Sequence, residues 1–264
     1  MHRKGPAGES AGPIVDAQGH DLRGTMTATS NAAPTNWQRE VETPPVQRPS
    51  LGSGHWALGR ALTVLLTGSA GVSGLKAMLD LYGVVLINGW RADPSSIVVS
   101  DGRHFDALTQ LFAILSLLLL IVTGIATMTW LYQAYGSREA DRALLRYRRW
   151  WTIGGWLIPI ASLVRPFQLM RDLYRATSGA QPQELSEPGV KDPSRFRWWW
   201  ACWLISNLLS NITFRLLLGN PGLGPLQTAL SLDVFSQVLQ IAAAVLFMGV
   251  LNSITRNLRR RARA

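Results

Sequence analysis

Two stripes of polar side chains lie in the apolar stretches near the C-terminal end of the chain, each at helical spacing. The first stripe is Asn207, Asn211 and Arg215, flanked by Ser206 and Ser210. The second stripe is Asp233, Gln237 and Gln240, flanked by Ser236. Residues three or four apart share one face of a helix, so each stripe predicts a polar helix face inside an apolar environment.

The two stripes are predicted to face each other, because only the short loop 219–225 separates their stretches. A helical rise of about 1.5 Å per residue places Arg215 and Asp233 at similar depth. We therefore expect an Arg215–Asp233 ion pair, with the amides of the two stripes opposite one another. Inside a membrane such groups either hold helices together or line a path for an ion or small solute, and both interpretations are open.

A second candidate site is a group of arginines on both sides of the apolar residues 150–164. These candidate lipid-headgroup contacts are Arg148, Arg149, Arg165, Arg171 and Arg175. Basic clusters beside a membrane attract anionic lipids by about 1 kcal/mol per residue. The same charges also serve as plain anchors on the cytoplasmic side, so two interpretations are again open.

The arginines border a stretch rich in Trp, Gly and Pro, which is the candidate structural motif. Its members are Trp151, Gly154, Gly155, Trp156, Pro159 and Pro166. Proline removes a helical hydrogen bond and glycine loosens helical backbone, so the pattern predicts a broken helix. Tryptophan is typical of the membrane interface, whereas a rigid broken helix also provides backbone that shapes a ligand pocket.

Signals of catalysis and of metal binding are poor. The chain has 4 histidines, and their positions form no ligand cluster of known spacing. Cys202 is the one cysteine and lies in an apolar stretch, so no cysteine-based metal site is expected. The two carboxylates of the apolar runs, Asp80 and Asp233, belong to different helices. We expect no enzyme, no catalytic or metal-binding residues and no cofactor.

Four apolar runs must position these residues. Apolar residues make up 47% of the 264 and charged residues 16%, and the charges avoid residues 56–79, 107–131, 198–218 and 226–251 almost completely. An extension of the first run to Ile87 is the alternative for its end. About 20 helical residues cross the hydrocarbon core of a bilayer, so each run predicts a membrane span. Lys76 and Asp80, at the far end of the first run, are four residues apart and are expected to pair or to reach the interface.

The basic residues predict the topology. Residues 138–149, residues 165–197 and the C-terminal tail are rich in Arg, whereas the polar loop 88–105 and the loop 219–225 are not. Short cytoplasmic loops collect Lys and Arg, so all three basic regions are expected on the cytoplasmic side. This predicts an all-α integral membrane protein with four transmembrane helices plus a central Gly/Pro-broken re-entrant or interfacial segment. Five transmembrane helices are the alternative, which leaves a basic region on the wrong side.

Three parts follow along the chain. Residues 1–50 are rich in Gly, Pro, Ser and Thr, which predicts a disordered N-terminal tail. Residues 51–255 form the helical membrane domain, in which residues 166–177 are expected to be an amphipathic helix. Residues 256–264 form a basic cytoplasmic tail, so both termini are expected in the cytoplasm.

The region around the Trp, Gly and Pro motif resembles a known family. Beside that motif, the matching features are Trp130-Leu131-Tyr132, Ile160, Leu163, the run from Asp172 to Ser178, and Trp198-Trp199. They resemble an uncharacterised membrane family that is common in actinobacteria, domain of unknown function 4328, over roughly residues 56–252. Family members often carry Asn where this chain has Ser137 and Ser162. The resemblance implies a multi-span fold in a bacterial plasma membrane and implies no activity.

These features together predict a membrane-embedded interaction or regulatory component. Its expected partners are the lipid bilayer, anionic lipid headgroups and other membrane proteins. The alternative is a small solute or ion transporter or channel that uses the two polar stripes. A nucleic-acid partner is not expected, because the net charge of +10 has no soluble domain to carry it.

Overall fold

Four long helices and three short ones make up the part of the chain that the structure describes. The structure is a computed structural model, and it describes residues 48–96, 99–179, 193–219 and 222–263, all within one unit. The long helices are α2 (Ser53–Ala92), α3 (Val99–Gly136), α8 (Ser194–Leu217) and α9 (Leu223–Arg263). The short ones are α4 (Trp151–Leu157), α5 (Pro159–Ser162) and α6 (Arg165–Ser178), with 3-10 turns η1 (Pro94–Ser96) and η2 (Arg142–Leu144). The predicted disordered tail, apart from residues 48–50, and residues 180–192 fall outside the described residues.

Three of the helices, α2, α3 and α9, are long and apolar enough to cross a membrane. The middle of α3 exposes large side chains on nearly every face, and Ile114 is 60% exposed. A helix that is apolar all round is stable in lipid rather than in water. Helix α8 has 24 residues, enough for about 36 Å, but its tryptophans and polar stripe make it less apolar.

The long helices exceed the predicted spans. Helix α2 continues to Ala92 and α3 begins at Val99, so the prediction of a loop over residues 88–105 is wrong for most of its length. Contacts with α9 accompany the extension, because Arg91 donates to Oε1 of Gln227 at 2.6 Å and Gln227 donates to Oδ1 of Asn88 at 2.9 Å. Nearer its middle, α2 also approaches its neighbours closely at Gly83. A Cβ at Gly83 would lie 2.6 Å from the Phe105 ring of α3 and 2.9 Å from Leu230 of α9. At the other end, the basic residues 256–263 continue α9 as helix.

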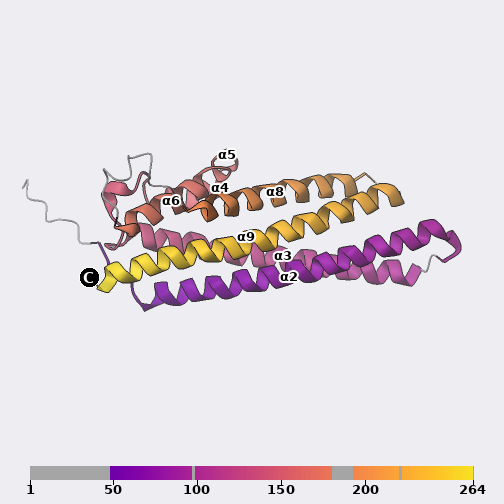
Figure 1. The fold of residues 1–264 in the computed structure, drawn as a ribbon, viewed down its shortest axis with the longest axis horizontal. Coiled ribbons are helices and arrows are strands. Elements are labelled where there is room, and N and C mark those ends of the chain that lie inside the picture. The colour runs from indigo at the N-terminus through magenta and orange to yellow at the C-terminus, as the bar shows by residue number, and fades with distance from the viewer. Residues whose placement is uncertain (1–47, 97–98, 180–192, 220–221, 264) are drawn as a thin grey trace, which may run out of the picture. The chain divides into compact units, whose positions relative to one another are not determined.

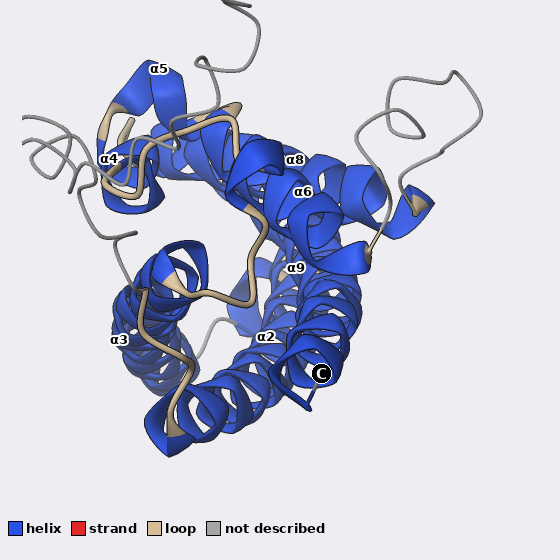
Figure 2. Ribbon diagram, turned by 90° about the vertical axis from the view of Figure 1, so that its left-hand side faces the viewer, coloured by secondary structure: helices blue, strands red, loops and turns tan. Residues whose placement is uncertain are grey.

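The long helices pack in the order α3, α2, α9, α8, each against the next. Figure 2 shows this arrangement along the helices, with α3 and α8 on opposite sides. The largest fully buried side chains gather toward one end of the unit, where α6 also packs, and include Trp130, Leu169, Phe196 and Ile254. This end holds the start of α2 and the end of α9, as Figure 1 shows.

The central segment is broken as the glycines and prolines predict. Helix α4 ends at Leu157, and Ile158 is extended (φ −84°, ψ 117°) before Pro159 opens α5. The predicted amphipathic helix is confirmed as α6, which ends at Gly179 with a left-handed φ of 82°. Helix α4 packs on α3, and α6 packs on α8 and α9. The central segment therefore contacts the helices at both ends of the order α3, α2, α9, α8.

The segment stays near the end of the unit where the C-terminus lies (Figure 1). Trp200 donates from its indole Nε1 to the carbonyl oxygen of Leu163 at 3.0 Å, at the junction of α5 and α6. Trp200 lies six residues from the start of α8, about 9 Å along the helix. The far end of α6 returns to the loop after α3, where the N–H of Asp141 donates to the carbonyl oxygen of Ala176.

Candidate functional site

The carboxylate of Asp233 pairs with Lys76 of α2 and not with Arg215, so the predicted Arg215–Asp233 pair is wrong. Lys76 also donates to both carboxylate oxygens of Asp80 at 3.0 Å, so the predicted contact between these two residues is confirmed. Asp80 is fully buried, whereas Arg215 is exposed near the end of α8. The prediction took α8 as the neighbour of α9, because a short loop joins these two helices. In the structure α9 packs on α2 as well as on α8, so Asp233 meets Lys76 instead.

The two polar stripes do meet, but their serines make the contacts. Ser206 donates to Oε1 of Gln240 at 2.9 Å, and the hydroxyls of Ser210 and Ser236 lie 2.9 Å apart. Ser236 also donates to the carbonyl oxygen of Ser206 at 3.0 Å. Hydrogen bonds of this kind between membrane helices stabilise their association by about 0.6 kcal/mol each.

The amides of the first stripe bond to their own helix instead. Asn207 donates to the carbonyl oxygen of Trp203 at 2.7 Å, and Asn211 donates to that of Asn207 at 2.8 Å. Gln237 is half-buried on α9. Among the described residues, the side-chain hydrogen bonds across this interface involve Ser206, Ser210, Ser236 and Gln240. The α8–α9 interface is therefore a polar contact between helices, and transport along it stays a prediction.

Two of the candidate headgroup arginines hold the central segment in place. Arg149 donates to the carbonyl oxygen of Tyr132 at 2.9 Å, and its guanidinium lies 3.7 Å from the centre of the Tyr132 ring. Arg165 lies over the rings of Tyr147 and Trp151, at 4.4 and 4.9 Å. Stacked guanidinium groups gain cation–π attraction and keep some of their N–H donors free to bind anions.

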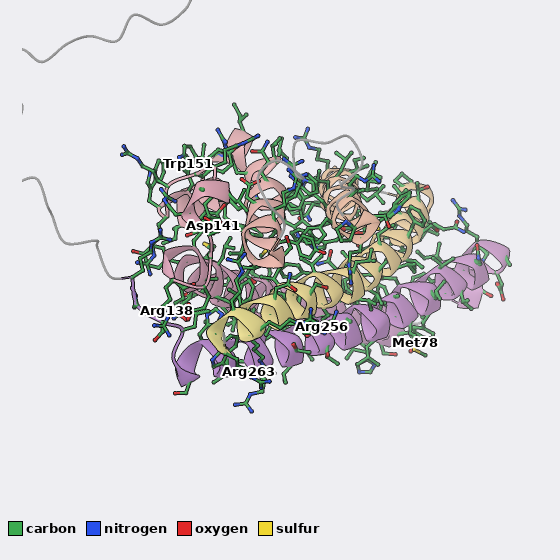
Figure 3. The ribbon with its side chains drawn as sticks, turned by 60° about the vertical axis from the view of Figure 1, so that its left-hand side comes forward. Met78, Arg138, Asp141, Trp151, Arg256 and Arg263 are labelled. Carbon is green, nitrogen blue, oxygen red and sulfur yellow. The ribbon has the colours of Figure 1, made fainter. Side chains whose placement is uncertain are left out.

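The remaining candidates lie at the same end and differ in exposure. Arg148 is exposed, Arg171 lies 5.6 Å from the Phe167 ring, and Arg175 is half-buried on α6. Further exposed arginines join them from the loop after α3 and from the end of α9, namely Arg138, Arg142, Arg146, Arg256, Arg259, Arg260 and Arg263. Figure 3 shows Arg138 and Arg263 at this end, far from Met78 of α2. We call this surface the basic end.

The opposite end of the unit, which we call the balanced end, carries no excess of positive charge. Around the α2–α3 turn, Arg91 and Arg103 accompany Asp93, Asp101 and Asp106. The hydroxyl and the N–H of Ser95 both donate to Asp93, which holds the pKa of that carboxyl below its ordinary value. The charge asymmetry between the two ends is the one that positive-inside sorting produces.

The glycines and tryptophans of the central motif allow close packing. A Cβ at Gly155 would lie 2.9 Å from Cβ of Arg165, so this glycine lets α4 approach α6. Trp156 meets Trp203 of α8 edge to face, with ring centres 6.4 Å apart. Pro159 and Pro166 occupy the first turns of α5 and α6, where a missing N–H is tolerated.

The outer face of α4 and α5 is apolar and exposed. Its side chains are Ile153, Leu157, Ile158, Ile160, Leu163 and Val164, and Ile160 is the most exposed at 84%. Trp150, which immediately precedes α4, is half-exposed and stacks on Trp151 with ring centres 4.2 Å apart. A cluster of this size on a short segment is typical of a surface that contacts lipid or protein.

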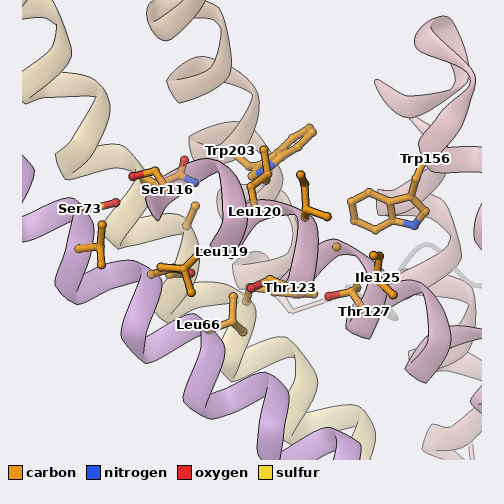
Figure 4. Close-up of a pocket in the computed structure, with 18 of the residues that line it drawn as sticks. Leu66, Ser73, Ser116, Leu119, Leu120, Thr123, Ile125, Thr127, Trp156 and Trp203 are labelled. Carbon is orange, nitrogen blue, oxygen red and sulfur yellow. The ribbon is translucent and has the colours of Figure 1, made fainter. Parts of the chain in front are cut away.

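A pocket of about 430 Å³ lies between the long helices, next to the Trp, Gly and Pro motif. Side chains from α2, α3, α8 and α9 line it, together with Trp156 and Ser162 from the central segment (Figure 4). Sequence reasoning missed this pocket, because the charge-free stretch of α3, residues 107–131, shows no conspicuous polar stripe. The hydroxyls of Ser116, Thr123 and Thr127 were the available signal, since their spacing places them on one helix face.

Comparison with known proteins identifies a family. A family model described as a domain of unknown function, DUF4328, matches residues 97–256, from the start of α3 to the last turns of α9. The match begins at residue 97, after α2, whereas the resemblance in the sequence was expected to begin at about residue 56. Comparison with curated proteins and with solved structures finds no match. Since the family model covers more than half of the chain, this protein belongs to the DUF4328 family.

Proposed function

We propose that this protein is a multi-pass membrane protein that binds anionic phospholipids at its basic end. In this proposal α2, α3, α8 and α9 cross the bilayer, and α4 and α5 enter it from one side without crossing. The protein acts as a binding or regulatory component rather than as an enzyme. The observation that carries the proposal is the exposed apolar face of α4 and α5 directly beside the basic end.

The apolar face supports insertion into lipid. Leu157 and Ile160 are 69% and 84% exposed, and burying such a side chain contributes about 1.5–3 kcal/mol. The junction of α5 and α6 contacts Trp200 only about 9 Å along α8, whereas the hydrocarbon core is about 30 Å thick. This depth suits an interfacial or re-entrant segment, with Trp150 at the headgroup level.

The arginines supply the charge for headgroups. Arg148 is exposed immediately before Trp150, so a lipid beside the apolar face would place its phosphate within reach of this guanidinium. The acids at this end include Glu139, which is 3% exposed and accepts a hydrogen bond from the N–H of Leu51. The excess of positive charge favours the cytoplasmic side of a bacterial plasma membrane for the basic end, and therefore for the start of α2 and the end of α9.

A measurement of lipid selectivity tests this proposal. The protein is placed in bilayers of phosphatidylcholine and phosphatidylglycerol, and electron spin resonance of spin-labelled lipids gives the fraction of each that the protein immobilises. We expect a preference for phosphatidylglycerol, which Arg148→Gln weakens by about fivefold, equivalent to about 1 kcal/mol.

The matched control is Arg103→Gln, which removes the same charge from an exposed site on α3 at the balanced end. This variant should keep the selectivity of the unmodified protein. Equal immobilisation of both lipids by the unmodified protein, or equal losses in the two variants, would contradict headgroup binding at the basic end.

A further inference from the structure

The pocket beside Trp156 is elongated along α3. Both Ser116 and Met128 of α3 line it, twelve residues apart, so it extends for about 18 Å. It encloses about 430 Å³ over that length. One extended hydrocarbon chain fits a space of this length and volume.

The pocket wall continues onto the outer surface of α3. Leu120, Ile121 and Ile125 line the pocket, and each also exposes about half of its surface. This part of α3 belongs to its apolar stretch, which in the proposed topology lies in the hydrocarbon core. A ligand therefore enters sideways from the bilayer, so a membrane lipid is the available occupant.

Two polar groups at the pocket lack hydrogen-bond partners within the described residues. They are the indole Nε1 of Trp156 and the hydroxyl of Thr123, and both atoms are buried. Both residues line the pocket, and leaving a buried donor unsatisfied is unfavourable, so a ligand that brings an acceptor oxygen to Trp156 would be favoured. Figure 4 shows both side chains beside the pocket, on different helices.

We propose that the pocket holds one acyl chain of a phospholipid, whose ester carbonyl oxygen accepts a hydrogen bond from Trp156 Nε1. The chain runs along α3 past Thr123 toward Ser116, and the phosphate of the same lipid lies at the basic end. This inference rests on the proposed function, which places the lipid headgroup at the basic end, and adds a binding site for an acyl chain of the same lipid. Trp156 belongs to α4, whose preceding residues carry the exposed Arg148, so one segment contacts both halves of the molecule.

Gly124 offers a way to fill the pocket without disturbing the helices. It lines the pocket, and a Cβ there would meet only the Met128 methyl group at 3.9 Å. Gly124→Leu therefore places a branched side chain where the acyl chain would lie. The matched control is Gly71→Leu on α2, because Gly71 is exposed and a Cβ there meets nothing within 4 Å.

Photo-crosslinking tests the inference in the full-length protein. The bilayers contain phosphatidylglycerol with a diazirine in the middle of one acyl chain, and mass spectrometry maps the adducts after illumination. We expect adducts on residues 116–128 and 240–247, with a yield that falls by about tenfold in Gly124→Leu, the change that about 1.4 kcal/mol produces. Gly71→Leu should leave the yield unchanged.

Trp156→Phe removes the N–H donor and leaves a smaller aromatic ring in its place. We expect it to lower the yield about fivefold, the effect of one hydrogen bond of about 1 kcal/mol. Unchanged yields in both Gly124→Leu and Trp156→Phe would overturn the inference, as would adducts confined to the outer face of α3. Selectivity for phosphatidylglycerol should survive Gly124→Leu, so loss of the pocket and loss of headgroup binding give different results.

Discussion

Replacing Lys76 by Met is expected to destabilise the folded protein by about 3–5 kcal/mol, because it leaves one fully buried and one partly buried carboxylate without their common cation. Lys76 lies between Asp80 of its own helix and Asp233 of α9, and Asp80 is fully buried. Met keeps the length of the side chain, so the loss reports the charge rather than a cavity. The measurement is the free energy of unfolding of the purified protein in mild detergent.

Two further variants separate this effect from general damage. Adding Asp80→Asn and Asp233→Asn to Lys76→Met removes all three charges and should restore most of the lost stability. Arg215→Met removes a cation that is exposed on α8 and should change the unfolding free energy by about 0.5 kcal/mol or less. Equal losses for Lys76→Met and Arg215→Met, or no rescue by the neutral triple variant, would contradict the ion-pair arrangement.

Gly155→Leu is expected to have the second largest effect, a destabilisation of about 1–3 kcal/mol from overpacking between α4 and α6. The added Cβ would lie 2.9 Å from Cβ of Arg165 and 3.4 Å from a methyl group of Leu169. Neither neighbour can move aside freely, because Cβ of Arg165 is bonded directly to the backbone and Leu169 is fully buried. The measurement is the same free energy of unfolding.

Gly71→Leu is the control for this prediction also, since it adds the same side chain to an open site on α2. The unfolding free energy of this variant should match that of the unmodified protein. If Gly155→Leu is equally harmless, α4 does not pack against α6 as described.

Features that depend on near neighbours in the chain could be predicted from the sequence. Pro159 breaks the central helix through its own missing N–H, and α6 shows its amphipathic pattern within four turns. The Lys76–Asp80 contact follows from a spacing of four residues on one helix. The apolar character of α2, α3 and α9 also follows from local composition.

Features that depend on which helices are neighbours could not be predicted in this way. Asp233 has two possible partners, and its choice of Lys76 depends on the packing of α9 against α2. The extension of α2 to Ala92 brings Asn88 and Arg91 to Gln227 of α9, a contact between distant parts of the chain. The pocket needs the order of all four long helices, because residues of α2, α3, α8 and α9 meet there.

Cysteine labelling in intact cells tests the central claim, that α4 to α6 leave and return on the cytoplasmic side. In a Cys202→Ser background, single cysteines replace the exposed residues Ala143, Ser178 and Ser100, before the segment, after it and at the opposite end. With a membrane-impermeant thiol reagent we expect Ser100→Cys to be labelled in intact cells, and Ala143→Cys and Ser178→Cys only after the cells are opened. Labelling of just one of Ala143→Cys and Ser178→Cys in intact cells would mean that the segment crosses the membrane, and would contradict the account.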